Sequence, residues 1–224
     1  MPAVIVAAVP VKDLVNAKQR LMRVLTPPER SALARAMLCD VLRALRAVPL
    51  DRVWVVTREP EIAAIATSMG AETLAEDDNR GHTAAVAAGQ AEAARAGAAV
   101  FVTIPGDVPC VTAGEVRALA AAAADAPAVF VPSHSGQGTN GVALAPPQVM
   151  PLRFGEPSFD NHLAAARARG LAPRTLVLPG LALDVDAPED LRALVAAGAH
   201  TESGRLVAAW ALDERLRTAG AETR

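Results

Sequence analysis

The chain has 224 residues, of which 52% are hydrophobic and only 3% aromatic, and its formal net charge is −2. A chain of this length can bury a large core, and with so few aromatic side chains that core must come from Ala, Val and Leu, as in helices packed on a Val-rich parallel sheet. The near-neutral charge provides no basic surface, so we expect no nucleic-acid partner.

The sequence shows no feature of a secreted or membrane protein. Its first ten residues lack a basic leader, and their apolar run is too short to cross a bilayer. Cys39 and Cys110 lack metal-ligand spacing; a single disulfide stays open, although two buried reduced thiols are the simpler interpretation. We therefore expect a soluble, cytoplasmic protein without a membrane partner.

Short Val-rich segments alternate with longer segments of helical periodicity. This alternation is typical of βαβ units and predicts an α/β fold. Strands are predicted at residues 1–10, 52–57, 72–74, 98–104, from 128, 142–144, 176–178 and 182–183. Helices are predicted from residue 27 and at residues 60–69, 83–95, 112–124, 158–169, 186–197 and 203–219.

Local signals mark the helix starts. Thr26-Pro27-Pro28-Glu29 is a capping box with proline in the first turn, and apolar residues recur every fourth position from Leu33 to Leu45. Ser158 is predicted to cap the helix that begins there. Residues 1–200 are expected to form one domain. Residues 201–224 form a predicted helical tail, which docks on the body or on a second copy in a homodimer.

The segment Ile104-Pro105-Gly106-Asp107-Val108-Pro109 places one carboxylate where an apolar strand ends. Ligands of open α/β sheets bind beyond the carboxyl ends of strands, and a carboxylate held there suits a hard divalent cation. The alternative is an aspartate that only caps the following turn. Asp184 and Asp186 form a second acidic pair that would point the same way along an extended segment, although Asp186 with Glu189 also fits an ordinary helix cap.

Two further segments suggest phosphate binding. Lys12, Lys18 and Arg20 follow the first strand and fit a polyphosphate clamp, or else a solvated basic turn. In the glycine-rich loop 133–141, backbone N–H groups and Thr139 could meet an anion, unless the loop is a simple flexible turn. The chain has no G-x-G-x-x-G or G-K-[ST] motif after the first strand, which excludes a dinucleotide-binding or P-loop site.

Together these residues favour magnesium-assisted transfer at a phosphate. Mg²⁺ is commonly held by one or two carboxylates and substrate phosphates, and such chemistry requires no protein nucleophile. None is found, since the chain has no G-x-S-x-G elbow. His82, His134 and His162 stand alone in the sequence, and loop or capping roles are predicted for them.

The same segments resemble a known family, the phospho-acid guanylyltransferases that make the linker of the deazaflavin redox coenzyme. The resemblance runs from Val6 to about Ala197. The motifs that carry it are Val9-Pro10-Val11-Lys12, Ala17-Lys18-x-Arg20-Leu21, Ile104-Pro105-Gly106-Asp107-Val108-Pro109, Gly138-Thr139-Asn140, Phe154-Gly155-x-x-Ser158-Phe159-x-x-His162 and Leu183-Asp184-Val185-Asp186-x-Pro188-Glu189-Asp190-Leu191.

The resemblance implies a Rossmann-like nucleotidyltransferase fold of the glycosyltransferase-A type. It also implies that a phosphorylated three-carbon acid (phosphoenolpyruvate, 2-phospho-L-lactate or 3-phospho-D-glycerate) attacks the α-phosphate of GTP and releases pyrophosphate. The roles it implies are Mg²⁺ ligands for Asp107, Asp184 and Asp186, acid contacts for Thr139, Gly155 and Ser158, and GTP-phosphate contacts for Lys12, Lys18 and Arg20, with Lys18, Arg20 and Asp107 as the catalytic groups.

One segment departs from the family pattern. Gly81-His82-Thr83 stands where the family usually has a Leu-Asn pair, and it resembles the start that related nucleotidyltransferases use near the base and ribose. Gly81 and Thr83 are therefore assigned to the nucleotide. Two alternatives follow from this departure: another nucleotidyltransferase, of the molybdopterin guanylyl- or cytidylyltransferase type, and a catalytically degenerate nucleotide-binding subunit.

Overall fold

A seven-stranded sheet forms the centre of the part of the chain that the computed structural model describes, residues 3–12, 18–75, 81–212 and 214–217. The strands are β1 (Ile5–Pro10), β2 (Arg52–Thr57), β3 (Glu72–Ala75), β4 (Val100–Thr103), β5 (Ala128–Pro132), β6 (Thr139–Leu144) and β7 (Arg174–Thr175). Their order is β3-β2-β1-β4-β6-β5-β7. β1 to β4 are parallel, β6 is antiparallel to β4 and β5, and β7 is parallel to β5.

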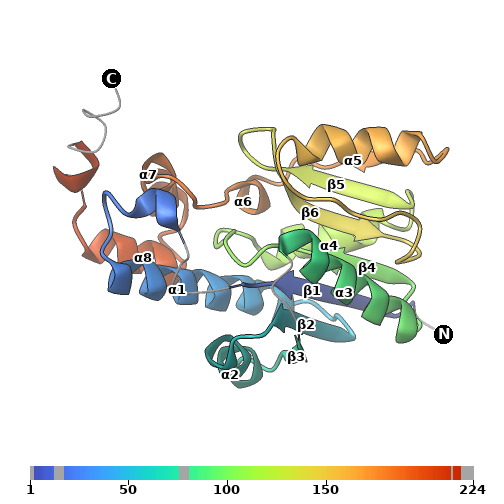
Figure 1. The fold of residues 1–224 in the computed structure, drawn as a ribbon, viewed down its shortest axis with the longest axis horizontal. Coiled ribbons are helices and arrows are strands. Elements are labelled where there is room, and N and C mark those ends of the chain that lie inside the picture. Colours follow the sequence, from blue (N-terminus) through green and yellow to red (C-terminus); the bar gives the residue numbers. More distant parts are fainter. Residues whose placement is uncertain (1–2, 13–17, 76–80, 213, 218–224) are drawn as a thin grey trace.

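Helices cover both faces of this sheet (Figure 1). They are α1 (Pro27–Arg46), α2 (Pro60–Ser68), α3 (His82–Arg95), α4 (Ala113–Ala122), α5 (Ser158–Arg167), α6 (Pro179–Ala182), α7 (Pro188–Ala197) and α8 (Glu202–Ala209), with a 3-10 turn η1 at Gln19–Leu21. α1, α2 and α4 pack on one face, and α3 and α5 on the other. This confirms the predicted α/β architecture. In the described residues, no helix is both long and apolar enough to cross a membrane.

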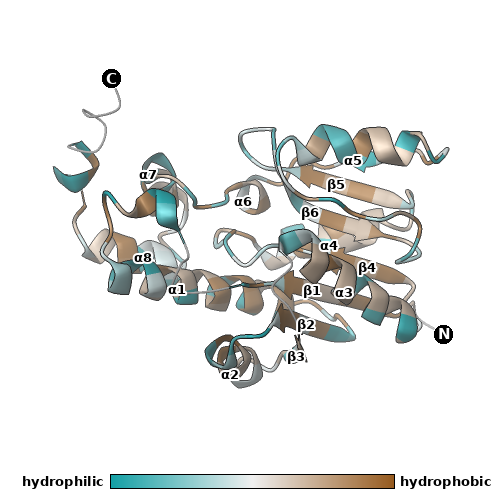
Figure 2. Cartoon of the chain, in the orientation of Figure 1, coloured by the Kyte–Doolittle hydropathy of each residue, from teal (hydrophilic) through white to brown (hydrophobic). Residues whose placement is uncertain are grey.

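The strands supply side chains to a core on each face of the sheet. Ala7 of β1 packs on the α1 side and Ala8 on the α3 side, as the two-residue period of a strand requires. The largest side chains gather on the α3 side, where Trp54, Phe101 and Phe130 are fully buried. Because the sheet is covered on both faces, its central strands are continuously hydrophobic (Figure 2).

The predicted start of α1 is confirmed. The Thr26 hydroxyl accepts a hydrogen bond from the backbone N–H of Glu29, and the Glu29 carboxylate accepts one from the backbone N–H of Thr26. The apolar stripe from Leu33 to Leu45 is buried along its length. Cys39 and Cys110 are free thiols; Cys110 is buried as expected, whereas Cys39 is only half-buried. Ala17 of the basic motif and residues 76–80 of the segment before α3 lie outside the described residues.

Two predictions around the glycine-rich loop are wrong. Residues 139–141, expected in the loop, are the start of β6. Gly141 pairs with Val131 of β5, and a Cβ at Gly141 would lie only 2.7 Å from the Leu181 side chain. Ser158 is the first residue of α5 rather than its cap. Its hydroxyl donates a hydrogen bond of 3.2 Å to Thr139 Oγ1.

The segment before α7 also differs from prediction. The strands expected at 176–178 and 182–183 are replaced by β7 at Arg174–Thr175 and by the short helix α6. Gly180 allows this, because its backbone N–H donates to Glu115 at 2.7 Å and a Cβ there would lie 2.2 Å from the Cys110 carbonyl oxygen. Asp186 does not cap α7. Instead, Asp190 accepts hydrogen bonds from the backbone N–H groups of Asp186 and Ala187.

The C-terminal helix α8 packs beside α1 and α7, away from the sheet (Figure 1). Val207, Leu212 and Leu216 join the buried cluster there. Asp40 of α1, only 7% exposed, accepts hydrogen bonds from the backbone N–H groups of Glu202 and Ser203, both at 2.9 Å. The carboxylate thus occupies the N-terminus of α8, where the helix dipole favours negative charge. The division at residue 200 stays a prediction.

Replacing Asp40 tests this anchor. Asp40→Asn removes the charge and turns an amide N–H toward a backbone donor, so we expect the free energy of unfolding to fall by about 2 kcal/mol. Urea denaturation at pH 7 measures it. Asp125→Asn is the matched control, because Asp125 is 74% exposed in its ion pair with Arg174 and should change stability by less than about 0.5 kcal/mol. Equal effects of the two variants would contradict the anchor.

Candidate active site

A buried ammonium group connects three distant parts of the chain. Lys18 Nζ lies 2.7 Å from Asp107 Oδ2 and 2.7 Å from Asp186 Oδ1, and the Lys18 side chain is only 7% exposed. Asp107 lies in the turn after β4, and Asp186 lies just before α7. The backbone of Lys18 has φ 57, a left-handed conformation that is uncommon for a residue with a Cβ. Lys18 is thus held by its surroundings in the position that joins the two carboxylates.

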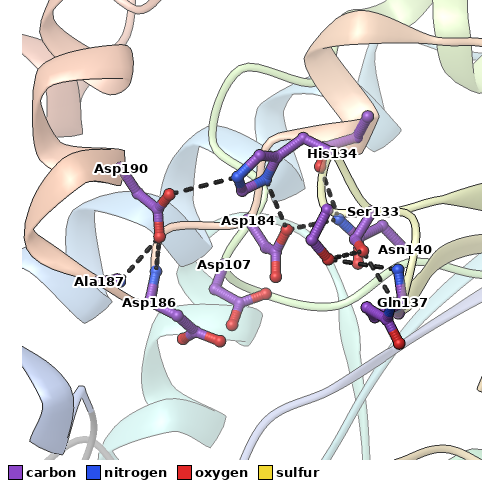
Figure 3. Close-up of polar contacts among 12 residues, drawn as sticks. Asp107, Ser133, His134, Gln137, Asn140, Asp184, Asp186, Ala187 and Asp190 are labelled. Atoms are coloured by element: carbon purple, nitrogen blue, oxygen red, sulfur yellow. Dashed lines mark hydrogen bonds and ion pairs between the residues drawn. The ribbon is translucent and has the colours of Figure 1, made fainter. Parts of the chain in front are cut away.

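Asp184 lies beside this pair, and Figure 3 shows the three carboxyl groups together. Its Oδ1 accepts a hydrogen bond of 3.0 Å from the side-chain amide of Asn140, which also donates to the Ala182 carbonyl. His134 lies between Asp184 and Asp190, with one ring nitrogen 3.5 Å from each carboxylate. Asn140 therefore fixes the Asp184 side chain from the β6 side.

The charges of this cluster shift its pKa values in opposite directions. Burial alone would raise the pKa of Asp107, but the Lys18 ammonium outweighs it and the pKa is lowered. Burial raises the pKa of Asp184, and the neighbouring Asp107 charge adds to this effect, while the Asn140 hydrogen bond opposes it. For Lys18, burial is outweighed by its two carboxylate partners, so its pKa is raised. Three carboxyl groups thus converge near one buried ammonium group, which lowers the pKa of Asp107 but leaves that of Asp184 raised.

The described residues contain no ready-made group of three or more His, Cys, Asp or Glu side chains arranged to hold a metal ion. The geometry instead offers two carboxylates that share one cationic group, with Asp184 next to them. Two carboxylates with further oxygens from substrate phosphates are a common Mg²⁺ site. The donor set is therefore suitable for magnesium, and the three-ligand assignment stays a prediction.

Two cavities meet at this cluster. One has a volume of about 310 Å³ and also includes Lys18 and residues of α1; the other has a volume of about 510 Å³ and extends toward β6 and α5. Residues that line both are Lys12, His82, Pro105, Asp107 and Asp186. The carboxylates and Lys12 thus stand where a ligand in one cavity would face a ligand in the other.

Gly81 lies beside Lys12 at the start of α3. Its φ of +99° would strain any residue with a side chain, whereas a Cβ there would lie 3.6 Å from Lys12 Nζ, an ordinary contact distance, so the backbone conformation and not the space requires glycine. Next to it, burial lowers the pKa of His82, against the opposing influence of Asp107. The His82 ring meets the Phe154 ring edge-on, with ring centroids 4.6 Å apart. His82 lines both cavities, although only a loop or capping role was predicted for it.

The larger cavity brings together the residues assigned to the phospho-acid. Thr139, Gly155 and Ser158 all line it, and Gly155 has φ +113, a conformation suited to glycine. Thr83 lies in the same cavity, where its hydroxyl accepts a hydrogen bond of 2.9 Å from the backbone N–H of Phe154. Thr83 therefore ties the start of α3 to the loop that carries Gly155.

Other assigned residues lie elsewhere. Arg20 is exposed on η1 and lines neither cavity, so its phosphate contact stays a prediction. The expected backbone anion site in the glycine-rich loop is not available at Gly138, because the Gly138 N–H already donates to Ser133 Oγ at 2.9 Å. Gly136 makes a turn with φ +74.

His162 of α5 lies behind Thr139. Only a loop or capping role was predicted for this histidine. It is 2% exposed, and its ring stacks on Phe130 with centroids 5.3 Å apart. Its Nδ1 lies 3.0 Å from Thr139 Oγ1, and its Nε2 accepts a hydrogen bond of 3.0 Å from the backbone N–H of Arg153. Burial lowers the pKa of His162 to about 4, so the ring is neutral at pH 7.

Solved structures share this fold. A protein from Desulfovibrio desulfuricans G20, described as a nucleotide-diphospho-sugar transferase, aligns with TM-score 0.78 and 16% identity over 96% of this chain and 97% of its own. A nucleotidyl transferase from Methanothermobacter aligns with TM-score 0.62 and 16% identity over 96% of this chain and 99% of its own. At this identity the likeness concerns the fold. The fold is that of the nucleotidyltransferases, as predicted.

Sequence comparison identifies the family. The model of the family described as "Guanylyl transferase CofC like" matches residues 5–219. The phosphoenolpyruvate guanylyltransferase of Rubrobacter xylanophilus is 40% identical over 86% of this chain and 94% of its own length. The 2-phospho-L-lactate guanylyltransferase of Methanothermobacter thermautotrophicus is 36% identical over 88% of this chain and 86% of its own. The chain belongs to the CofC-like guanylyltransferase family, which confirms the resemblance found in its motifs.

The buried imidazole of His162 makes stability depend on pH. Its pKa of about 4 in the folded protein lies below its ordinary value of 6.5, so between these values the unfolded chain binds a proton that the folded protein does not. Stability therefore rises with pH across this interval, and His162 should lower the free energy of unfolding by about 2 kcal/mol at pH 5 relative to pH 7.5. Urea denaturation at the two pH values measures it.

His162→Gln is expected to lose this part of the pH dependence, because it has no titrating side chain. His200→Gln, at an exposed histidine, is the matched control. The same difference between pH 5 and pH 7.5 in the wild type and in His162→Gln would contradict the neutral, buried imidazole.

Proposed function

We propose that this chain transfers GMP from GTP to a phosphorylated three-carbon acid, in the biosynthesis of a deazaflavin coenzyme and with Mg²⁺ as its metal. The observation that carries the proposal is the Lys18 ammonium 2.7 Å from both Asp107 and Asp186, at the junction of two cavities. Such a junction suits a reaction between two bound substrates. The names of the relatives, phosphoenolpyruvate and 2-phospho-L-lactate guanylyltransferase, support the choice of donor and acceptor.

The proposed reaction forms one bond to phosphorus and breaks another. A phosphate oxygen of the acid attacks the α-phosphorus of GTP, and the bond from that phosphorus to the bridging oxygen of the β-phosphate breaks, so pyrophosphate leaves with the electron pair. The protein mainly positions groups and stabilises charge in such a step. Lys12 faces both cavities and is suited to a phosphate of the donor or the acceptor.

The carboxylates would hold the metal. Asp107 and Asp186 supply hard oxygen donors, and Asp184 lies beside them. A bound Mg²⁺ would neutralise charge on the attacking and leaving oxygens. Lys18 contacts both Asp107 and Asp186 and so keeps these carboxylates close together. The three carboxylates thus form a negatively charged site on which a divalent cation and an anionic triphosphate can bind together.

The larger cavity is the proposed acid site. Thr139, Gly155 and Ser158 line one part of it, and the first turn of α5 begins there. Backbone N–H groups of a helix N-terminus attract anions. Thr83 and His82 line the same cavity and both contact Phe154, next to Gly155, so they would border the acid as well as the nucleotide. The choice among the three acids would depend on the shape of the cavity that these residues line.

Turnover assays test the proposal directly. The protein is incubated with each of GTP, CTP, ATP and UTP and with a mixture of phosphoenolpyruvate, 2-phospho-L-lactate and 3-phospho-D-glycerate, with Mg²⁺ or with EDTA. Pyrophosphate release and product mass are measured. We expect a guanylylated acid only with GTP and Mg²⁺. Turnover with CTP alone would instead indicate the cytidylyltransferase alternative, and GTP binding without turnover on any acid the degenerate subunit.

A single substitution tests the role of Asp107. Asp107→Asn keeps the shape of the side chain and removes its charge, so we expect kcat to fall by about 100-fold or more while the protein stays folded. Circular dichroism and urea denaturation check the fold, and Asp125→Asn, at an exposed aspartate, is the control. Wild-type turnover in Asp107→Asn would remove this residue from the mechanism.

A further inference from the structure

Three buried side chains form a hydrogen-bonded group at the wall of the larger cavity. Thr139 of β6, Ser158 at the start of α5 and His162 one turn later are 6%, 2% and 2% exposed. Thr139 Oγ1 lies 3.2 Å from Ser158 Oγ and 3.0 Å from His162 Nδ1. Thr139 and Ser158 line the cavity, whereas His162 stands behind them.

The backbone determines which ring nitrogen of His162 carries the proton. The Arg153 N–H can only donate, and it points at Nε2 at 3.0 Å. Nε2 must therefore offer a lone pair, and in a neutral imidazole the proton is then on Nδ1. Nδ1–H consequently donates to Thr139 Oγ1, the acceptor within reach.

This donation leaves the Thr139 hydroxyl with one free function. A hydroxyl oxygen has two lone pairs and one proton. Ser158 Oγ–H donates to Thr139 Oγ1, and His162 Nδ1–H donates to the same oxygen, so both lone pairs are used. The Thr139 proton is then free to be donated to a ligand in the cavity that Thr139 lines.

The His162 ring is held firmly in this orientation. It lies parallel to Phe130, with an interplanar angle of 2°, and meets Phe154 edge-on at a centroid distance of 5.1 Å. Burial also keeps the imidazole neutral, with its pKa lowered to about 4. The ring therefore contributes direction to the Thr139 hydroxyl and no charge of its own.

We propose that His162 is a positioning residue that makes the Thr139 hydroxyl a dedicated donor to an anionic oxygen of the acceptor substrate. The identity of that substrate as a phospho-acid rests on the proposed function. An anionic oxygen has only lone pairs to offer, so a hydroxyl with its proton free is complementary to it. A hydroxyl free to rotate would present its own lone pairs part of the time, and these repel an anion.

A merely structural role for His162 is distinguishable, because its two nitrogens serve different partners. The amide of His162→Asn reaches the position of Nδ1 and can still donate to Thr139, but it loses the Arg153 contact. The amide of His162→Gln reaches the position of Nε2 and can still accept from Arg153, but it loses Thr139. If His162 positions the Thr139 hydroxyl, His162→Gln should weaken acid binding more than His162→Asn. If His162 only supports the loop through Arg153, His162→Asn should weaken it more.

Steady-state kinetics with GTP and the preferred phospho-acid distinguishes the positioning role of His162 from a structural one. We expect His162→Gln to raise KM for the acid about ten-fold, with KM for GTP within about two-fold of wild type, and His162→Asn to raise the acid KM several-fold less. In a Thr139→Val background the Asn and Gln variants should have the same acid KM, because the hydroxyl they act through is gone. An acid KM that is higher in His162→Asn than in His162→Gln would overturn the proposal, as would a difference that persists in Thr139→Val.

Nitrogen-15 NMR of the wild-type protein tests the proposal without measuring turnover and without any substituted variant. At pH 7 we expect the His162 ring to be neutral with its proton on Nδ1, and the Nδ1–H signal to shift on titration with inorganic phosphate or phosphoenolpyruvate. A proton on Nε2, or a Nδ1–H signal that neither anion shifts, would overturn the proposal. If the wild type shows these NMR features but transfers no nucleotide, the proposed function fails while the role of His162 stands.

Discussion

The arrangement of the site depends on one ammonium group. Lys18 contacts Asp107, 89 positions away, and Asp186, 168 positions away, both at 2.7 Å. Two carboxylates that lie close together repel each other, and a cation between them offsets this repulsion. The buried ammonium of Lys18 lies between Asp107 and Asp186, and the two cavities meet at this point. Lys18 itself adopts a left-handed backbone conformation, which is energetically unfavourable for a residue with a Cβ.

The larger cavity shows a second way of preparing a site for an anion. No cation lies among Thr139, Ser158 and His162. Instead, hydrogen bonds from buried neutral groups decide which way a hydroxyl proton can point. The charged groups thus lie at the junction of the cavities, where bonds to phosphorus would form and break. At the wall of the larger cavity, neutral groups orient the Thr139 hydroxyl instead. Membership in the CofC-like guanylyltransferase family agrees with the proposal that the molecule binds two phosphate compounds in these cavities.

Much of the fold was predictable because its signals are local. The Thr26 capping box and the apolar stripe from Leu33 to Leu45 depend on neighbours within one or two helical turns, and both are confirmed. Predictions were wrong where distant contacts override local preference. Residues 179–182 form a helix because Gly180 fits against the Cys110 carbonyl and Glu115. For Asp186 two roles were left open, a helix cap and a site carboxylate; Asp190 makes the cap of α7, and Asp186 contacts Lys18.

The sequence by itself determined the family, the α/β class and the residue types of the site, since ordered motifs and hydrophobic periodicity are properties of the chain alone. Only the tertiary structure decided how these residues are used. It paired Lys18 with two carboxylates, placed Arg20 outside both cavities, and put His162 behind Thr139. These outcomes follow from contacts between segments far apart in the chain, and local sequence patterns do not reveal which distant residues will meet.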